Sequence, residues 1–225
     1  LVLMDSAVRS KAPLFTRLRQ ALASAPVDLL VFVAKGAAPA AQAIAYTSLE
    51  VKDFGAGYAD AVLRYCRHLD AVGVHEVSHA IVVLARHPKA PRYSVTLPVK
   101  SLHTVSARAV EATLAALDLA TADDAAVLAA KVTTPPGATF VEERARPDRN
   151  EEPTVTVRID RKWVGNDQSV SEATFALLGA LDATKTVAEA VAEYAELCGV
   201  TPDDVRADVL AFVRQSLGRG LLIPG

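Results

Sequence analysis

The segment His75–His79 (HEVSH) has the most recognisable chemistry in the chain, because it matches the motif H-E-x-x-H. On a helix, two histidines four positions apart share a face and bind zinc, while the glutamate activates a zinc-bound water. The residues that follow, Ala80–Ala85, are rich in β-branched side chains and favour a strand. On a strand, His75 and His79 would lie about 13 Å apart, too far to share one zinc. We therefore expect no metal ligands here.

A second segment, Asp53–Ala59 (DFGAGYA), imitates the Asp-x-Gly-x-Gly-x-Gly loop in which methyltransferases bind S-adenosylmethionine. Glycines in such a loop let the backbone approach the ligand closely. The strand expected before it, Ser48–Val51, is short, and Leu84–Arg86 offers no acidic residue for the ribose hydroxyls. We expect a turn followed by the start of a helix.

Two further places were candidates for function. Asp5-Ser6 follows a predicted strand, and α/β folds bind ligands at the carboxyl ends of their strands. These residues are the part of the chain that we expect nearest to an active site, unless they only cap a loop. Trp163, beside Arg161 and Lys162, is expected to anchor the terminal domain to the rest of the chain.

The elements that must position these residues begin with a strand, a helix and a strand, which form a βαβ unit. The hydrophobic periodicity predicts the following elements in the first part of the chain: strand Leu1–Val8, helix Lys11–Ala25, strand Val27–Ala34, helices Ala40–Leu49 and Gly57–Ala71, strand Val74–Arg86 and a possible edge strand Arg92–Val99.

The second part of the chain is predicted to be mainly helical. It is predicted to contain helices Val105–Leu117 and Asp123–Lys131, strand Thr154–Ile159, and helices Val170–Leu181, Val187–Cys198 and Thr201–Arg219. Thr201 is the expected N-cap of the last helix, with Pro202 at its first position. A charged stretch containing prolines, at residues 147–153, predicts a boundary between domains 1–146 and 154–225.

Composition limits the functions that are open to the chain. The 225 residues carry a formal net charge of −2, so no overall basic field attracts nucleic acid. Cys66 and Cys198 are expected to be reduced residues packed in helices. No apolar run reaches the roughly 18–20 residues of a membrane span, so we expect no membrane partner and a cytoplasmic location. The start at an apolar strand, with no Met, predicts that an upstream part of the protein is missing.

The stretch Leu177–Leu222 is similar to the PqqD-like family of winged-helix, peptide-binding domains. Its matching elements are Leu181-Asp182, Thr186-Val187, Pro202-Asp203 and Arg219–Leu222. The resemblance implies a module that binds a leader peptide or DNA, or that only packs. Asp203, Asp204 and Asp208 oppose Arg206 and Arg214 on the last helix, whereas a DNA-reading helix needs a net basic face.

The N-terminal half resembles the end of a class I methyltransferase domain, which finishes with a strand, a helix and two strands that form an antiparallel pair. The matching segments are 1–8 (LVLMDSAV), 11–25 (KAPLFTRLRQALASA), 27–36 (VDLLVFVAKG) and 58–88. In particular, the chain resembles actinobacterial methyltransferases with an Asn-Pro-Pro-aromatic loop that would hold the target nitrogen. That loop does not occur here, so the resemblance places the chemistry upstream of residue 1.

The expected fold is therefore α/β: the C-terminal part of a Rossmann-like methyltransferase sheet with a small winged-helix-like domain. The expected activity is methyl transfer from S-adenosylmethionine to a nitrogen of a protein or nucleic acid. The cofactor would be bound mainly by residues outside this chain, and no catalytic or cofactor-binding residue is assigned. Two alternatives stay open: a zinc-dependent hydrolase using His75, Glu76 and His79, and a non-enzymatic winged-helix protein that binds peptide or DNA. Oligomeric state is not predicted.

Overall fold

The computed structural model describes residues 2–9, 14–23, 25–86, 90–143 and 154–225. The chain divides into two compact units, Leu1–Pro98 and Val99–Gly225. Each unit contains helices and strands, which confirms the mixed α/β class. The domain boundary predicted at residues 147–153 lies outside the described residues. Within the described part of the chain, no helix is both long and apolar enough to span a membrane.

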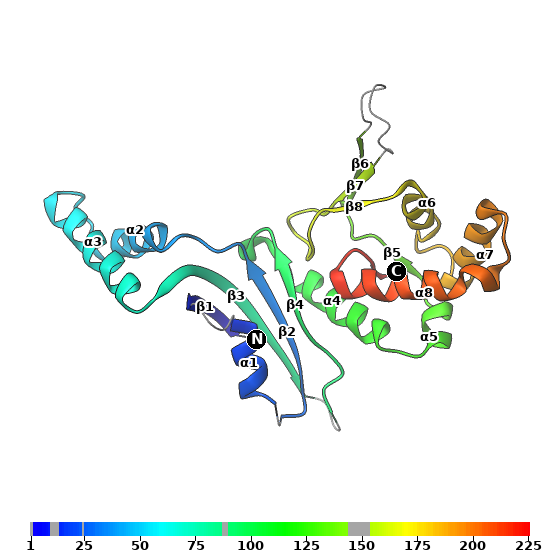
Figure 1. Ribbon diagram of the computed structural model, residues 1–225, viewed down its shortest axis with the longest axis horizontal. Helices are drawn as coiled ribbons and strands as arrows, with labels where there is room; N and C mark the ends of the chain where they lie inside the picture. Colours follow the sequence, from blue (N-terminus) through cyan, green and yellow to red (C-terminus); the bar gives the residue numbers. More distant parts are fainter. Residues whose placement is uncertain (1, 10–13, 24, 87–89, 144–153) are drawn as a thin grey trace. The chain divides into compact units, whose positions relative to one another are not determined.

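The first unit is built on a four-stranded sheet with the order β1-β3-β2-β4 (Figure 1). Its strands are β1 (Val2–Arg9), β2 (Val27–Ala34), β3 (Val74–Arg86) and β4 (Ser94–Val99). Both β1 and β2 pair antiparallel with β3, so β1 and β2 run parallel to each other on either side of it. Pairs such as Met4 with Ala80 and Val31 with Val82 set the register. The predicted strand–helix–strand order is present, and β4 is an edge strand as expected.

Helix α1 (Leu14–Ala21) covers one face of this sheet. Its apolar side chains pack on alternate residues of β2 and β3, and this core contains Leu14, Phe15, Leu18, Leu22, Leu29, Val31, Ala80 and Val82. On the opposite face of β2, Leu30 and Phe32 are also fully buried. A strand that is buried on both faces needs a continuous apolar run rather than an alternating one, which is why the sequence VDLLVFVA suits this position.

A pair of helices connects β2 to β3. Helix α2 (Pro39–Glu50) contacts helix α3 (Ala56–Ala71), and the pair extends beyond the end of the sheet (Figure 1). Leu69 of α3 packs on Val74 and Val77 at the beginning of β3. The two predicted helices are confirmed. Helix α2 continues to Glu50, so the strand that an S-adenosylmethionine loop would need at Ser48–Val51 is not formed.

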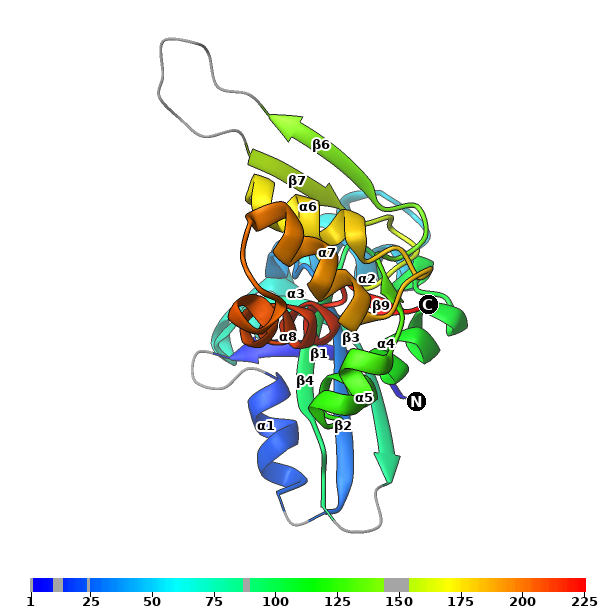
Figure 2. The ribbon, with the colours of Figure 1, turned by 90° about the vertical axis from the view of Figure 1, so that its right-hand side faces the viewer.

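The second unit is mainly helical, with two small sheets (Figure 2). Its helices are α4 (Ala107–Ala120), α5 (Asp124–Ala129), α6 (Glu172–Ala180), α7 (Val187–Cys198) and α8 (Pro202–Arg219), after a 3-10 turn at Leu102–Thr104. Strands β6 (Thr139–Glu143), β7 (Thr154–Arg158) and β8 (Gln168–Val170) form one sheet, and β5 (Val132–Thr133) pairs with β9 (Ile223–Pro224). Of these strands, only β7 was predicted.

Local hydrogen bonds fix both ends of the last two helices. The N–H and hydroxyl of Thr201 donate to the Asp204 carboxylate at 2.9 and 2.6 Å, which confirms Thr201 as the N-cap of α8. Thr186 and Glu189 form the equivalent capping box at α7. Gly199 and Gly220 end these helices with φ angles of 68° and 75°, in the left-handed region that favours glycine.

Helices α4 and α5 pack on α7 and α8, so these four helices share one compact unit. Val209, Val213 and Leu217 of α8 are buried, as the helical spacing predicted. Cys198 differs from its prediction: it is exposed at the end of α7, because the helix turns its final residues outward. Cys66 is half-buried, and both cysteines are free thiols.

Candidate functional site

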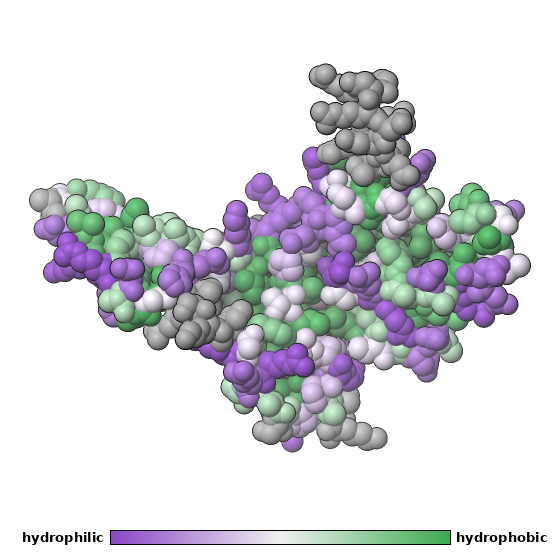
Figure 3. Space-filling view, in the orientation of Figure 1, coloured by the Kyte–Doolittle hydropathy of each residue, from purple (hydrophilic) through white to green (hydrophobic). Residues whose placement is uncertain are grey.

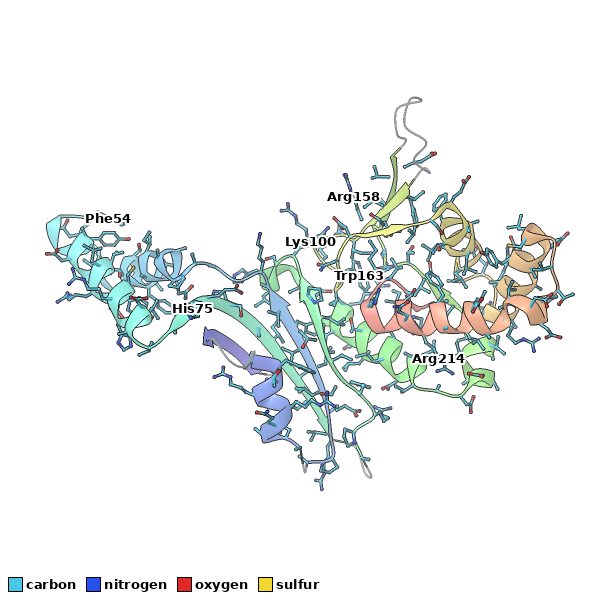
Figure 4. The ribbon with its side chains drawn as sticks, viewed as in Figure 1. Phe54, His75, Lys100, Arg158, Trp163 and Arg214 are labelled. Atoms are coloured by element: carbon cyan, nitrogen blue, oxygen red, sulfur yellow. The ribbon has the colours of Figure 1, made fainter. Side chains whose placement is uncertain are left out.

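The HEVSH segment lies in strand β3, as its β-branched continuation predicted (Figure 4). His75, Glu76 and His79 are exposed there. The Glu76 side chain lies directly over Gly36, at a place where a Cβ atom would collide with it. Two histidines four apart on a strand are separated by about 13 Å. Among the described residues, no group of three or more His, Cys, Asp or Glu side chains is arranged to hold a metal ion.

The glycine-containing segment Asp53–Ala59 forms the turn between two helices. The Gly55 N–H donates to the Asp53 carboxylate at 3.1 Å, and Gly55 is the N-cap of α3. The rings of Phe54 and Tyr58 lie 5.0 Å apart at this turn. A helix rather than a strand precedes this turn, so the segment Asp53–Ala59 lacks the strand-to-helix context of a nucleotide-binding loop. The predicted turn and helix start are present.

Asp5 and Ser6 do not follow a strand, which corrects their expected position. They lie in the middle of β1, where Asp5 pairs with His79 and Ser6 pairs with Ser78. Strand β3 has 13 residues, so β1 continues to pair with it beyond Asp5 and Ser6 as far as Arg9. The carboxyl end of β1, and any ligand position beside it, is therefore at Arg9, three residues beyond Ser6.

A buried ion pair that the sequence analysis missed joins β2 to the residues before β4. Asp28 is only 1% exposed. Its carboxylate accepts from the Arg92 N–H at 2.6 Å and from the Arg92 guanidinium at 3.0 and 2.8 Å. Burial by itself would raise the pKa of Asp28, but these hydrogen bonds and the charge of Arg92 lower it below its ordinary value. The signal in the sequence was an isolated aspartate in an otherwise apolar strand.

A cavity of about 430 Å³ lies next to this ion pair, and its walls include Arg19, Leu22, Leu29, Arg92 and Tyr93. The Arg92 guanidinium stands 5.5 Å from the centre of the Tyr93 ring. Leu29 also donates its N–H to the Tyr93 carbonyl at 3.2 Å. The ion pair, the ring and this backbone bond together fix the segment before β4 against β2.

In the second unit, the sheet β6-β7-β8 has two edge strands, β6 and β8. Phe140 of β6 and Phe175 of α6 are 41% and 38% exposed, and their rings lie 5.2 Å apart. At the approach to β8, the Asp167 carboxylate accepts from Lys100 at 2.6 Å and from the Ile159 N–H at 2.9 Å. The bond from Lys100, reinforced by that from Ile159, lowers the pKa of Asp167. An edge strand held in this way presents main-chain N–H and C=O groups that an extended peptide can pair with.

The cations of helix α8 are largely engaged within the protein. Arg214 donates to the carbonyls of Ala120 and Ala122 at 2.6 and 2.7 Å, and to Asp124 at 2.7 Å (Figure 4). Arg206 pairs with Asp203 at 3.0 Å on the surface of the same helix. A helix that reads DNA would need such cations to face phosphates. The contacts of α8 therefore suit packing rather than nucleic-acid recognition.

Trp163 is buried, and its backbone N–H donates to the Asp160 carbonyl at 3.0 Å. These contacts place it in the turn that follows β7 (Figure 4). Its expected role as an anchor between domains stays a prediction.

Comparison with known proteins assigns part of the second unit. Residues 169–222 match the family described as Coenzyme PQQ synthesis protein D (PqqD). The match covers the end of β8 and helices α6, α7 and α8. The terminal module is therefore PqqD-like, as the resemblance predicted. No curated protein matches the chain.

Proposed function

We propose that the chain is the C-terminal part of an S-adenosylmethionine-dependent methyltransferase, and that its PqqD-like module docks a polypeptide substrate. The catalytic motif would lie upstream of Leu1. This portion would complete the sheet and contribute surface on the substrate side. The role of a protein in such a reaction is to align the acceptor nitrogen with the methyl group, which lowers the entropic part of the barrier.

The observation that carries this proposal is the topology of the first sheet. Strands β1 and β2, which are joined by helix α1, run parallel to each other, and β3 lies between them and pairs antiparallel with both. A strand, a helix and a final antiparallel pair are what the resemblance to a class I methyltransferase requires at the end of the domain. Strand β1 is also an edge strand of the described sheet, so its outer main-chain groups offer a place for preceding strands to pair.

The position of the helical pair supports a role for this unit on the substrate side. Because β1 and β2 are parallel, their carboxyl ends lie at the same edge of the sheet. Ligands of open α/β sheets bind at that edge. Helix α2 follows the carboxyl end of β2, and α3 leads back into β3. The α2–α3 pair is thus attached where a bound cofactor and its acceptor would lie.

The substrate class rests on the second unit. Arg206 and Arg214, two cations of α8, already pair with carboxylates of this chain, which speaks against a phosphate-binding face. Binding of a leader peptide is one of the roles that the resemblance to PqqD-like modules implies, and the edge strands β6 and β8 would provide main-chain groups for such a peptide. We therefore favour a polypeptide over a nucleic acid as the methyl acceptor.

The test compares two proteins: residues 1–225, and the longer product that begins at the start codon of the gene. Calorimetric titration with S-adenosylmethionine should detect binding to the longer protein and none to residues 1–225. The upstream sequence should contain an Asp-x-Gly-x-Gly loop followed by Asn-Pro-Pro-aromatic. An upstream start codon within a few residues of Leu1, or a longer protein that does not bind the cofactor, would overturn the proposal.

A second function is favoured by one observation, the match of residues 169–222 to the PqqD family. In this alternative the protein binds a peptide and has no enzymatic activity. The two functions separate in an assay for transfer of labelled methyl groups from S-adenosylmethionine to polypeptides of the source organism. Labelled polypeptides support the methyltransferase, whereas peptide binding by a longer protein that transfers no label supports the binding module.

A further inference from the structure

Helix α2 has its polar and apolar side chains on unexpected sides. Ile44 and Leu49 are 50% and 76% exposed, whereas Gln42 and Thr47 are only 7% and 6% exposed. Exposing large aliphatic side chains while burying an amide and a hydroxyl has an unfavourable solvation free energy. The arrangement is reasonable if the outward face of α2 is buried against something else.

The exposed face of α2 is mainly apolar and consists of Ala40, Ala41, Ile44, Ala45 and Leu49, with the half-buried Ser48 among them. These residues recur at intervals of three and four, so they share one side of the helix. The Ser48 hydroxyl lies 2.7 Å from the hydroxyl of Tyr58 in α3. Figure 3 shows hydrophobic side chains at the surface of the α2–α3 pair. A helix whose outer side carries a wide apolar face is normally covered on that side.

The sizes of these side chains follow an order along the helix. The small residues Ala40 and Ala41 lie at its beginning and the large Leu49 lies at its end. Phe54, 73% exposed, follows in the turn beyond the helix. If a second α2 packs antiparallel on the first, the large residues of each copy lie over the small residues of the other. The midpoint of Pro39–Glu50 falls between Ile44 and Ala45, so the two-fold axis would pass there.

The charges at the two ends of α2 complement each other in the same arrangement. Lys35 is exposed shortly before the helix, and the N-cap Ala38 provides no side-chain cap for the positive end of the helix dipole. Glu50 is exposed at the opposite end. An antiparallel pair would bring Glu50 of each copy towards Lys35 and the helix N-terminus of the other.

We propose that the exposed face of α2 is a homodimer interface, and that its occupant is the α2 helix of a second copy of this chain. The order of sizes and the order of charges are separate observations, and both fit the antiparallel two-fold arrangement. Such an interface is isologous, since each patch is complementary to itself. The proposal is independent of the methyltransferase function.

The expected dimer is reversible. A helix of 12 residues is about 18 Å long, so a contact made by one helix per copy lies at the small end of specific interfaces. Sedimentation velocity of the 225-residue chain should therefore show monomer at low micromolar concentration and a growing dimer fraction as the concentration rises.

Substitutions on α2 test the location of the interface. Ile44→Asp places a carboxylate at the two-fold axis and should weaken the dimer about 100-fold or more. The control is Leu197→Asp on α7, where an equally apolar residue is 68% exposed and the dimer should be unaffected. Circular dichroism should show the same helix content for both variants. A chain that stays monomeric at several hundred micromolar, or a dimer that Ile44→Asp leaves intact, would overturn the proposal.

A charge exchange tests the antiparallel orientation. Glu50→Lys and Lys35→Glu, each alone, should weaken the dimer about five-fold by placing like charges opposite each other. The double variant restores opposite charges across the axis and should recover most of the affinity. If the double variant lost as much dimer affinity as the two single variants lose together, α2 would not be packed antiparallel and the proposed occupant would be wrong.

Discussion

At the scale of single residues, the pair of Asp28 and Arg92 is the most consequential contact of the first unit. Asp28 is almost fully buried and receives three hydrogen bonds from one residue. A buried carboxylate is tolerated when it is paired and hydrogen-bonded, and it becomes costly when the partner is removed. Sequence alone could mark Asp28 as unusual but could not name Arg92, which lies more than sixty positions away.

Arg92→Ala should therefore reduce the free energy of unfolding by roughly 1–3 kcal/mol, because Asp28 would lose its charged partner while Arg92 itself is partly screened by solvent. Urea denaturation at pH 7 measures this change. Asp208→Asn, which removes an exposed carboxylate of α8, is the control and should change stability little. Equal effects of the two substitutions would show that the ion pair contributes nothing.

The pH dependence of stability follows from the lowered pKa of Asp28. A carboxylate whose pKa is lower in the folded than in the unfolded state stabilises the fold above its unfolded pKa, near pH 4, and this contribution is lost as the pH falls further. The stability difference between the parent protein and Asp28→Asn should thus be largest near neutral pH and shrink below about pH 4. A difference that grows on acidification would contradict the ion pair.

The histidines of the HEVSH segment lead to a prediction about metal content. His75 and His79 are on a strand rather than on one face of a helix, so they do not form a shared zinc site. Elemental analysis of the purified protein should find far less than one zinc per chain, and a chelator should leave the melting temperature unchanged. Stoichiometric zinc that is lost in a His75→Ala variant would restore the hydrolase hypothesis.

At the scale of secondary-structure elements, the ends of helices α7 and α8 look alike in sequence but differ in their surroundings. Both end at a glycine with positive φ. A Cβ atom added at Gly199 meets no atom within 4 Å, whereas one at Gly220 would lie 2.7 Å from the Val164 carbonyl oxygen. Glycine is common at the end of a helix, but only the packing shows which of these two glycines is in close contact.

Gly199→Ala should cost about 1 kcal/mol, the price of left-handed backbone for a residue with a Cβ atom. Gly220→Ala should cost clearly more, because the turn that contains Val164 must also move. Thermal denaturation of the two variants gives the comparison. Similar losses for both would mean that the close approach between Gly220 and Val164 relaxes without cost.

Arg214 connects three helices, since it extends from α8 to the carbonyl of Ala120 at the end of α4, to that of Ala122 in the following turn and to Asp124 of α5. Arg214→Ala should lower the free energy of unfolding by about 1–3 kcal/mol, as expected when charge-assisted hydrogen bonds to a helix end are lost. Arg206→Ala removes an exposed pair on the same helix and should cost less than about 1 kcal/mol. If the order of these two effects were reversed, α8 would not be held by Arg214.

At the scale of the whole molecule, charge is balanced, with 24 basic and 26 acidic residues. Affinity for nucleic acid depends mainly on the number of phosphates that basic side chains neutralise. Fluorescence anisotropy with a labelled random-sequence duplex should therefore show little binding near physiological salt, and only a shallow dependence on salt concentration. Tight binding with a steep salt dependence would favour the DNA-binding alternative over the peptide-binding one.

The sequence by itself determined the order and type of most elements in both units. Local signals were sufficient for strand β2, for the helices α3, α7 and α8, and for the N-cap Thr201, because period, caps and helix-ending glycines act within a few residues. Strands β5, β8 and β9 escaped detection because they have only two or three residues each and exist through pairing with distant segments.

Only the tertiary structure decided which segments became neighbours. Because β3 lies between β1 and β2, Asp5 and Ser6 are in the middle of a paired strand. Because α4 packs on α8, residues outside the PqqD match belong to the same unit as that module. The exposure of Ile44 and Leu49 on α2 is likewise a result of the tertiary structure. Each depends on contacts between residues far apart in the chain, and periodicity reveals that a face is apolar but not what covers it.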